Sequence, residues 1–380
     1  MKMRFAFVLF KYFPFGGLQR DFSRIAEALI ALGHEVDAYC IIWDGPMPEN
    51  MNVHIAPIKA FSNHQRNARF ATWLKTAFQD KHYDAIVGFN KISGLDVYYA
   101  ADPCYQDKAL TLRHPLYRLS SRYKQFYQQE RSVFSTKSTT EILMISEVQK
   151  PLFQKHYRTP DARFHLLPPG ISEDRKAPKN AEEIRSRFRK EWDIEDNHQL
   201  MLMVGSGFKT KGLDRALLAL ASLPEKQKAN TRFIVIGQDN PKTFLQQAKS
   251  FGIENNVTIL KGRNDIPQFL LGADMLIHPA YNENTGTILL EAVVAGLPVL
   301  VTAVCGYAHY IDEAHVGTVL DSPFNQAALN DALSSMLSSD KTQWQKNALS
   351  FSAQADIYSM PTRAAQIIEA TALKKQSTPS

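Results

Sequence analysis

Two carboxylates, Glu283 and Glu291, lie in the segment 278–299. The order of residue types there indicates the end of a strand, a polar loop, and a helix that begins at Gly286 and stops at Gly296. Unpaired N–H groups at a helix start bind anions, and glycine lets a ligand approach the backbone closely. The segment therefore predicts a diphosphate site with a hydroxyl-binding carboxylate on each flank, as a nucleotide sugar requires. On spacing alone, the alternative is a solvent-facing Glu291 and a helix-capping Glu283.

A glycine-rich segment, 204–212, follows a predicted strand and ends at a predicted helix. Its Lys211 could meet a phosphate group as a point charge, and the alternative is a solvated loop lysine. The chain contains no Asp-x-Asp pair, so the carboxylate clamp that would hold a divalent ion on a nucleotide diphosphate is missing. The sequence therefore predicts that Lys211, backbone N–H groups and a helix dipole neutralise the leaving group without a metal cofactor.

The first half of the chain supplies further candidate residues. Gly16 and Gly17, in a turn at 15–17 after the first predicted strand, could bring N–H groups to the same diphosphate, although glycine pairs also occur in turns for steric reasons alone. Asp102 follows the predicted strand 97–101, and ligands bind at the carboxyl ends of parallel strands. Asp102 is therefore a candidate for contacting the acceptor hydroxyl, and the alternative is an aspartate that starts a turn before proline.

Short apolar runs alternate with helical patterns along the chain, which indicates an α/β fold with parallel sheets built from βαβ units. A length of 380 residues leaves room for two domains, and the alternation breaks near 166–170. We therefore expect two Rossmann-like, doubly wound domains facing a central cleft. The acceptor-binding domain is expected at 1–169 and the nucleotide-sugar-binding domain at 170–359. The C-terminal helix, 360–375, could complete the first domain or cap the second.

The composition is that of a globular protein with an anionic partner. Hydrophobic residues make up 44% and charged residues 22%, which excludes a disordered chain, and the net charge is +6. Cys40, Cys104 and Cys305 are far apart, so neither a disulfide framework nor a zinc site is expected. The apolar run at the N-terminus is too short for a signal peptide, and no stretch reaches the roughly 20 apolar residues of a membrane span. A cytoplasmic location is therefore expected.

The segment 105–134 is basic and aromatic, with six Lys or Arg against two acidic residues. An interfacial helix has this pattern, with rings such as Tyr123 at the headgroup level and cations on anionic lipid. The expected membrane-surface residues are Arg113, Arg118, Arg122 and Lys124. The alternatives are a solvated helix with its aromatic residues in the core, and a nucleic-acid surface, which no recognition motif supports.

Several segments resemble the retaining glycosyltransferases of family GT4, which have the GT-B architecture. The Glu-x7-Glu pattern followed by Ala-Gly-Leu-Pro-Val at 295–299 carries the resemblance most strongly. Within that family, the chain is similar to the lipopolysaccharide core glucosyltransferases from about residue 4 to about residue 370. The other segments that match are 11–21, 88–91, 94–98, 167–171 and 302–310.

The resemblance implies a metal-independent enzyme that transfers glucose from UDP-glucose, with retention, to a heptose of the lipopolysaccharide inner core. It implies front-face attack, in which the leaving phosphate oxygen assists deprotonation of the acceptor and no protein nucleophile is required. The lipid-anchored, phosphorylated acceptor implies a peripheral position on the inner face of the inner membrane. The alternatives are another donor, UDP-N-acetylglucosamine or UDP-galactose, and an inactive membrane-binding scaffold.

The resemblance also implies roles for single residues. The backbone at Arg263 would read the uracil, and Lys209 could replace an arginine that the family carries where this chain has Ser206 or Thr210. The residues expected to act in catalysis are Asp102, Glu283 and Lys211. The residues expected to bind an acceptor phosphate are Arg20, Lys91 and Arg122. The residues expected to bind the donor are Gly16, Gly17, Lys209, Lys211, Arg263, Glu283, Asn284, Thr285, Gly286, Thr287 and Glu291.

Overall fold

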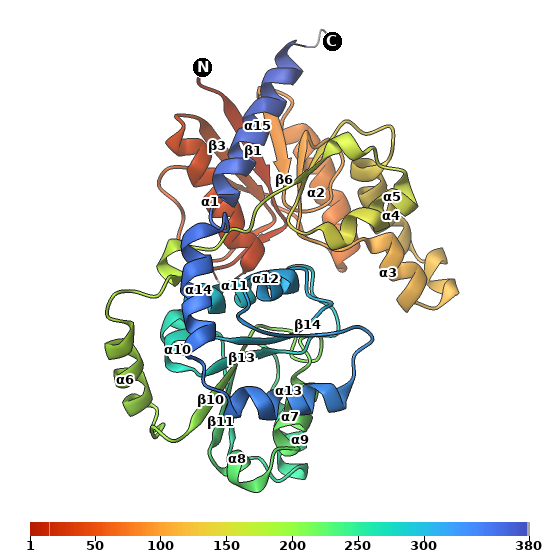
Figure 1. Cartoon of the computed structure of the whole chain (residues 1–380). Helices are drawn as coiled ribbons and strands as arrows, with labels where there is room; N and C mark the ends of the chain where they lie inside the picture. The colour runs from red at the N-terminus through yellow and green to blue at the C-terminus, as the bar shows by residue number, and fades with distance from the viewer. Residues whose placement is uncertain (15, 378–380) are drawn as a thin grey trace. The chain divides into compact units, whose positions relative to one another are not determined.

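The computed structural model describes residues 1–14 and 16–377 and divides into two compact units (Figure 1). Unit 1 holds Met1–Gly170 together with the C-terminal segment from Tyr358, and unit 2 holds Ile171–Ile357. Phe15, which belongs to the predicted turn at 15–17, lies outside the described residues. Each unit is built on one parallel sheet with helices packed on it, so the predicted α/β class is confirmed.

The seven-stranded sheet of unit 1 is parallel, in the order β5-β3-β1-β6-β7-β8-β9. Its strands are β1 (Arg4–Val8), β3 (Glu35–Cys40), β5 (Asn52–Ile55), β6 (Ala85–Gly88), β7 (Val97–Ala100), β8 (Glu141–Met144) and β9 (Phe164–Leu166). A separate pair is β2 (Lys11–Tyr12) and β4 (Ile42–Trp43). Phe5 and Phe7 of β1 enter one apolar cluster, and Ala6 and Val8 enter another. Burial on both faces explains why this strand is a continuous apolar run in the sequence.

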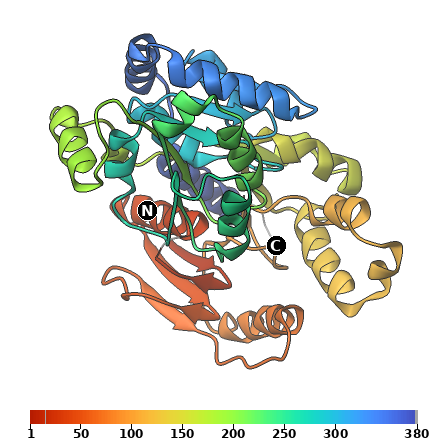
Figure 2. The same ribbon diagram turned by 90° about the horizontal axis from the view of Figure 1, so that it is seen from below.

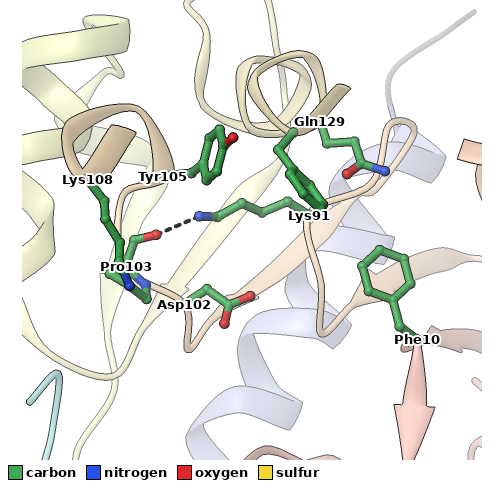
Figure 3. Close-up of a pocket in the computed structure, with 8 residues that line it drawn as sticks. Phe10, Lys91, Asp102, Pro103, Tyr105, Lys108 and Gln129 are labelled. Atoms are coloured by element: carbon green, nitrogen blue, oxygen red, sulfur yellow. Dashed lines mark hydrogen bonds between the residues drawn. The ribbon is translucent and has the colours of Figure 1, made fainter. Parts of the chain in front are cut away.

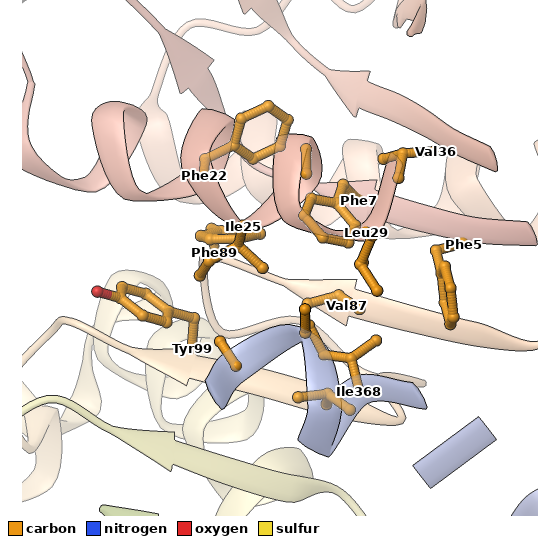
Figure 4. Packing of buried hydrophobic residues seen from close by; sticks show 14 of the residues in the cluster. Phe5, Phe7, Phe22, Ile25, Leu29, Val36, Val87, Phe89, Tyr99 and Ile368 are labelled. Carbon is orange, nitrogen blue, oxygen red and sulfur yellow. The ribbon is translucent and has the colours of Figure 1, made fainter. Parts of the chain in front are cut away.

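Helices cover both faces of this sheet (Figure 2). They are α1 (Gly17–Ala31), α2 (Asn63–Ala77), α3 (Tyr105–Leu112), α4 (Ser121–Phe134), α5 (Lys150–Tyr157) and α15 (Met360–Ser377). The α1 helix buries Phe22, Ile25 and Leu29 at helical spacing, and Ile368 of α15 joins the same cluster (Figure 4). Phe70 of α2 lies in the cluster on the opposite face. The C-terminal helix therefore packs on unit 1 beside α1.

The six-stranded sheet of unit 2 is parallel, in the order β12-β11-β10-β13-β14-β15. Its strands are β10 (Gln199–Val204), β11 (Thr231–Ile236), β12 (Val257–Leu260), β13 (Met275–His278), β14 (Val299–Thr302) and β15 (Gly317–Leu320). Its helices are α6 (Ala181–Glu191), α7 (Leu213–Ala221), α8 (Glu225–Ala229), α9 (Lys242–Ser250), α10 (Ile266–Gly272), α11 (Thr287–Val294), α12 (Ala308–Glu313), α13 (Gln326–Ser338) and α14 (Thr342–Gln354). The α7 helix buries Leu213, Leu217 and Leu220 in the core of this unit.

In each sheet the strand order reverses at one place, between β1 and β6 in unit 1 and between β10 and β13 in unit 2. Ligands of open α/β sheets bind outside the carboxyl ends of the strands at such switch points. The loops after β10 and β13 contain Lys211 and Glu283, whereas Lys91 follows β6 and Asp102 follows β7. Each group of predicted residues therefore lies at the carboxyl ends of its own sheet.

Candidate active site

The loops after β10 and β13 bring Lys211 and Glu283 into contact. The backbone N–H of Tyr281 donates to the carbonyl of Thr210 over 2.8 Å, which joins the two loops. The Lys211 Nζ contacts the Glu283 Oε2, and the two side chains are 20% and 12% exposed. Burial lowers the pKa of Lys211 below its usual value. The result is a partly buried ion pair at the switch point of unit 2.

Gly212 and Gly286 shape the helix starts beside this pair. They precede α7 and α11 and have φ angles of 79° and 82°, a left-handed conformation that glycine adopts far more readily than other residues. A Cβ on Gly212 would lie 2.0 Å from the carbonyl oxygen of Pro279, so the two loops pack too closely for any side chain there. Glycine at 212 therefore lets the two loops approach each other.

We expect Gly212→Ala to lower the melting temperature more than Gly252→Ala does. Both glycines have positive φ, so both variants bear the cost of a left-handed residue, about 1–2 kcal/mol. A Cβ on Gly252 meets no atom within 4 Å, whereas one on Gly212 meets the Pro279 carbonyl. Scanning calorimetry of the two variants measures the difference. Equal losses would contradict the close approach of the two loops.

His278 is a third member of this site. It ends β13, is fully buried, and its Nε2 lies 3.4 Å from the Glu283 Oε2. Burial, together with the charge on Lys211, lowers the pKa of His278 to about 3, so its imidazole is neutral near pH 7. A neutral imidazole can donate a hydrogen bond to the carboxylate and fix its orientation. Sequence alone favours a core histidine bonded to the backbone, and it gives no sign that His278 meets a carboxylate five residues further on.

Backbone contacts hold the part of the loop that carries Glu283. Its backbone pairs with that of Cys305 as an isolated bridge, and the carbonyl of Thr285 accepts from the N–H of Tyr307 over 2.8 Å. Thr287 begins α11, and Glu291 on the next turn is 6% exposed. The alternative of a solvent-facing Glu291 is therefore wrong.

Lys209 and Arg263 each pair with an acidic neighbour. The Lys209 Nζ lies 2.5 Å from Asp214 Oδ2, and Arg263 makes two hydrogen bonds to Asp265, of 2.7 and 2.6 Å. Both basic side chains have a carboxylate partner before any ligand binds. The backbone at Arg263 stays the predicted contact for the base.

Arg215 lies outside the predicted set but supports the site. Its guanidinium donates to the carbonyls of Pro279 and Ala280, at 3.1 and 2.9 Å, and lies 3.5 Å from the ring centroid of Tyr281. It therefore anchors the loop after β13 to α7. Its partners are 64 to 66 positions away in the sequence, so no local pattern could have revealed this role.

In unit 1, Gly16 and Gly17 lie at the start of α1. Gly16 precedes the helix with an extended backbone, φ −87°, and a Cβ on Gly17 would meet no atom within 4 Å. The first turn of α1 contains no acidic residue and includes the half-buried Arg20. Gly16 and Gly17 thus lie at a helix N-terminus, a position that favours anions.

A cavity of about 230 Å³ in unit 1 brings Lys91 and Asp102 together (Figure 3). Its lining includes Phe10, Lys91, Asp102, Tyr105, Phe126 and Gln129. Asp102 is exposed at its edge, and the guanidinium of Arg122 lies 5.8 Å from the ring centroid of Phe126. Arg20 is on α1 and is not part of this lining. Two predicted acceptor-side residues therefore share one cavity.

The segment 105–134 forms α3, a short 3-10 helix at Pro115–Leu119 and α4. The four predicted membrane-surface cations, Arg113, Arg118, Arg122 and Lys124, are all exposed. Tyr123, by contrast, is only 9% exposed and stacks on Tyr127, which packs against the core. The predicted headgroup-level position of Tyr123 is therefore wrong, because α4 uses this ring to pack on its neighbours.

Leucines supply the exposed apolar area of this segment instead. They are Leu110, Leu112, Leu116 and Leu119, which are 40–71% exposed. They lie on α3 and on the 3-10 helix, next in sequence to the exposed arginines. We call these four exposed leucines, together with the exposed Arg113, Arg118, Arg122 and Lys124 of the same segment, the leucine–arginine surface.

Two kinds of feature are absent from residues 1–14 and 16–377. None of their helices is both long and apolar enough to cross a bilayer. In the same part of the chain, no three His, Cys, Asp or Glu side chains are grouped so as to hold a metal ion.

Comparison with known proteins decides the family. Residues 15–175 match the model of Glycosyltransferase Family 4, and residues 184–351 match that of Glycosyl transferases group 1. The lipopolysaccharide glucosyltransferase WaaG of Escherichia coli K12 is 46% identical over 365 residues, which are 96% of this chain and 98% of WaaG. The chain belongs to the same glycosyltransferase family as WaaG.

Solved structures agree with this membership. A crystal structure of WaaG, a glycosyltransferase involved in lipopolysaccharide biosynthesis, matches with a TM-score of 0.92 and covers 96% of this chain and 99% of that one. Anabaena Alr3699/HepE in complex with UDP and glucose matches with a TM-score of 0.73 at 17% identity, covering 99% and 100% of the two chains. That second likeness concerns the fold alone. This family 4 glycosyltransferase therefore has the GT-B fold that its sequence predicted.

Proposed function

We propose that this glycosyltransferase transfers glucose from UDP-glucose to a heptose of the lipopolysaccharide inner core, with retention at the anomeric carbon. The observation that carries the proposal is the contact between Lys211 and Glu283 at the switch point of unit 2, in a chain 46% identical to a lipopolysaccharide glucosyltransferase. A cation between two helix starts suits a pyrophosphate, and a carboxylate beside it suits sugar hydroxyls. A nucleotide sugar presents both groups.

The donor would be bound by charge and by backbone. Lys211 and the N–H groups at the start of α11 take the two phosphates. The pyrophosphate then competes with Glu283 for the ammonium, which frees this carboxylate to accept hydrogen bonds from the hexose hydroxyls. Glu291, one turn further along α11, would accept from the ribose hydroxyls. Lys211 and the helix dipole neutralise the diphosphate, so the proposal needs no metal ion.

The reaction follows from the resemblance to retaining family 4 enzymes. The acceptor hydroxyl oxygen forms a bond to the anomeric carbon as the bond from that carbon to the β-phosphate oxygen breaks. The hydroxyl proton passes to the leaving phosphate oxygen, and the products are the glycoside and UDP. Lys211 stabilises the charge that develops on the leaving phosphate. Asp102 of unit 1 would orient the acceptor hydroxyl.

UDP release from each candidate donor tests this function. The purified full chain is incubated with UDP-glucose, UDP-galactose or UDP-N-acetylglucosamine, with and without a heptose-terminated core acceptor, in buffer with and without EDTA. We expect acceptor-dependent release from UDP-glucose that EDTA does not change. Preference for another donor would replace the donor assignment, and loss of turnover in EDTA would refute the metal-independent mechanism.

We also propose that the leucine–arginine surface binds the cytoplasmic face of the inner membrane, where a lipid-linked acceptor would be presented. Exposed leucines can enter the boundary between headgroups and acyl chains, while the arginines contact anionic headgroups. Leu116 and Leu119 are 66% and 71% exposed, and Arg118 lies between them in the same short helix. An apolar surface flanked by cations fits an anionic bilayer better than a neutral one.

We expect the triple variant Arg118→Glu, Arg122→Glu and Lys124→Glu to bind vesicles of phosphatidylglycerol and phosphatidylcholine at least about 100-fold more weakly than the wild type. Each cation near such a surface contributes about 1 kcal/mol, and reversal adds repulsion. Sedimentation with the vesicles measures the partition coefficient.

The matched control reverses three exposed lysines of unit 2: Lys226, Lys242 and Lys249. Its net charge equals that of the test variant, but we expect its vesicle binding to fall far less. The same loss in both variants would mean that net charge, and not the leucine–arginine surface, governs the binding.

A further inference from the structure

The cavity beside Asp102 contains a buried donor that has no partner among residues 1–14 and 16–377. Gln129 of α4 is 6% exposed, and within the described residues its Nε2 makes no hydrogen bond. It lines the same cavity as the Asp102 carboxylate and the rings of Phe10, Tyr105 and Phe126 (Figure 3). A buried amide N–H without an acceptor costs free energy, so a ligand that brings an acceptor to it would gain affinity there.

The charge of Lys91, which lines this cavity, is already compensated by a buried carboxylate. The Lys91 Nζ donates to the Pro103 carbonyl over 2.8 Å (Figure 3). The same Nζ donates to the Glu130 Oε2 over 2.5 Å. Glu130 has no exposed side-chain surface. Burial by itself would raise the pKa of Glu130, but Lys91 and hydrogen bonds outweigh burial and lower it, so the residue is a carboxylate. Lys91 and Glu130 therefore form a neutral pair.

Glu130 also fixes the loop that carries Asp102. Its two oxygens accept from the N–H of Tyr105 at 2.7 Å, from the N–H of Gln106 at 2.9 Å and from the Tyr157 hydroxyl at 2.7 Å. The Glu130 carboxylate therefore joins the start of α3 to the end of α5, where Tyr157 lies. Removing that charge would release this helix start and Lys91 together.

These groups select a class of ligand. The cavity offers an amide donor, a carboxylate acceptor and aromatic walls, while the charge of Lys91 is neutralised by Glu130. A sugar ring matches this set, because its hydroxyls both donate and accept and its C–H face packs on aromatic rings. A phosphate bound here would be repelled by the Asp102 carboxylate, and Lys91 would not attract it because Glu130 already compensates the lysine charge. The exposed Lys108 at the edge of the cavity is the cation that remains for an anionic substituent.

We propose that this cavity binds an uncharged sugar ring of the acceptor, with the Gln129 Nε2 donating to one ring hydroxyl and Asp102 accepting from another, and that Glu130 is the positioning residue of the subsite. The proposal rests on the proposed glycosyl transfer. It reassigns Lys91, predicted to bind an acceptor phosphate, to a structural pair with Glu130.

Gln129→Met tests the donor directly. Methionine keeps the volume of the side chain and removes the amide, and no hydrogen bond of Nε2 is lost because none exists within the described residues. We expect the KM for a heptose-terminated core oligosaccharide to rise about fivefold to tenfold, equal to one lost hydrogen bond. The KM for UDP-glucose and the slow hydrolysis of UDP-glucose without acceptor are expected to stay at the wild-type level. Gln128→Met, an exposed glutamine on the same helix, is the control and is expected to change neither.

The assay is run with phosphorylated and dephosphorylated acceptor, which separates a sugar subsite from a phosphate subsite. An equal loss with both acceptors supports the sugar ring. A loss confined to the phosphorylated acceptor, or an unchanged acceptor KM, overturns the proposal.

A binding measurement gives a readout without turnover. Saturation-transfer NMR measures how the wild type and Gln129→Met bind the dephosphorylated oligosaccharide. A wild type that binds the oligosaccharide but releases no UDP would refute the transfer reaction and leave the subsite standing, whereas a wild type that does not bind it refutes the subsite.

Glu130 is tested in a variant that removes both charges, Glu130→Gln with Lys91→Met. Replacing a buried ion pair by neutral groups of similar size is often tolerated, so this variant is expected to fold, as its melting curve will show. If Glu130 positions the subsite, the acceptor KM rises at least fivefold while the UDP-glucose KM and acceptor-free hydrolysis stay unchanged. An unchanged acceptor KM in the folded double variant overturns the positioning role. If the double variant does not fold, Tyr157→Phe, which removes one hydrogen bond to Glu130, decides by the same KM comparison.

Discussion

Glu283→Ala is expected to abolish sugar transfer while leaving the affinity for UDP within a few-fold of the wild type. The carboxylate is placed beside Lys211 and His278, and in the proposed complex it accepts hydrogen bonds from the hexose. UDP has no hexose, so its affinity reports only the phosphate and base contacts. Loss of one preorganised group at a transition state costs about 100- to 1000-fold in rate. UDP release with saturating donor and acceptor measures the first quantity, and titration calorimetry with UDP measures the second.

Two further variants control this result. Glu283→Gln keeps the size of the side chain and can still contact the hexose, so it separates loss of charge from loss of volume. Glu254→Ala removes an exposed carboxylate elsewhere in unit 2 and is expected to behave as the wild type. Wild-type turnover in Glu283→Ala would remove this residue from the mechanism.

Lys211→Met is expected to lower kcat/KM for UDP-glucose by about 100- to 1000-fold and, unlike Glu283→Ala, to weaken UDP binding as well. The Lys211 ammonium contacts Glu283 beside the helix starts of unit 2. In the proposed complex, the pyrophosphate binds at this ammonium. Methionine retains most of the side-chain volume, so the change isolates the charge. Steady-state kinetics should show a loss of turnover in both single variants. UDP titration separates them, because only Lys211→Met is expected to weaken UDP binding.

Stability provides an independent check on this ion pair. Lys211→Met leaves the Glu283 carboxylate, only 12% exposed, without its cation, and losing one partner of a buried pair costs about 3–5 kcal/mol. Because this pair is partly exposed, we expect a cost at or below the lower limit. The double variant with Glu283→Gln should regain much of that stability and no activity. If Lys211→Met keeps wild-type kcat/KM, the lysine is not the phosphate ligand.

Local patterns in the sequence were sufficient for the fold class and for most central strands. The buried runs at β1, β6, β7 and β10 are continuous and apolar, because both faces of a parallel strand are covered. Other elements carried weaker signals. The outer strand β5 is exposed or half-buried along its length, so its sequence, Asn-Val-His-Ile, lacks the apolar run that marks a central strand.

The sequence also placed Lys211, Glu283 and Gly286 in loops after strands, and that placement holds. The sequence shows these features directly because they involve neighbouring residues. A glycine stands next to the helix start, and a carboxylate precedes that glycine. Their chemistry as a donor site stays a prediction, supported by the contact between Lys211 and Glu283.

What the sequence by itself determined is therefore the class of the fold, its parallel strands and the loops at their carboxyl ends. Only the tertiary structure decided which distant side chains meet: His278 with Glu283, Arg215 with the loop after β13, and Glu130 with Lys91. It also placed Tyr123 inside and the leucines outside in the segment 105–134. The physical reason is that helix and strand periodicity reflects interactions between near neighbours, whereas burial and ion pairing depend on which elements pack together. Gln129 and Glu130 are adjacent on one helix and show the same local pattern, yet Glu130 pairs with Lys91 whereas the Gln129 Nε2 makes no hydrogen bond within the described residues.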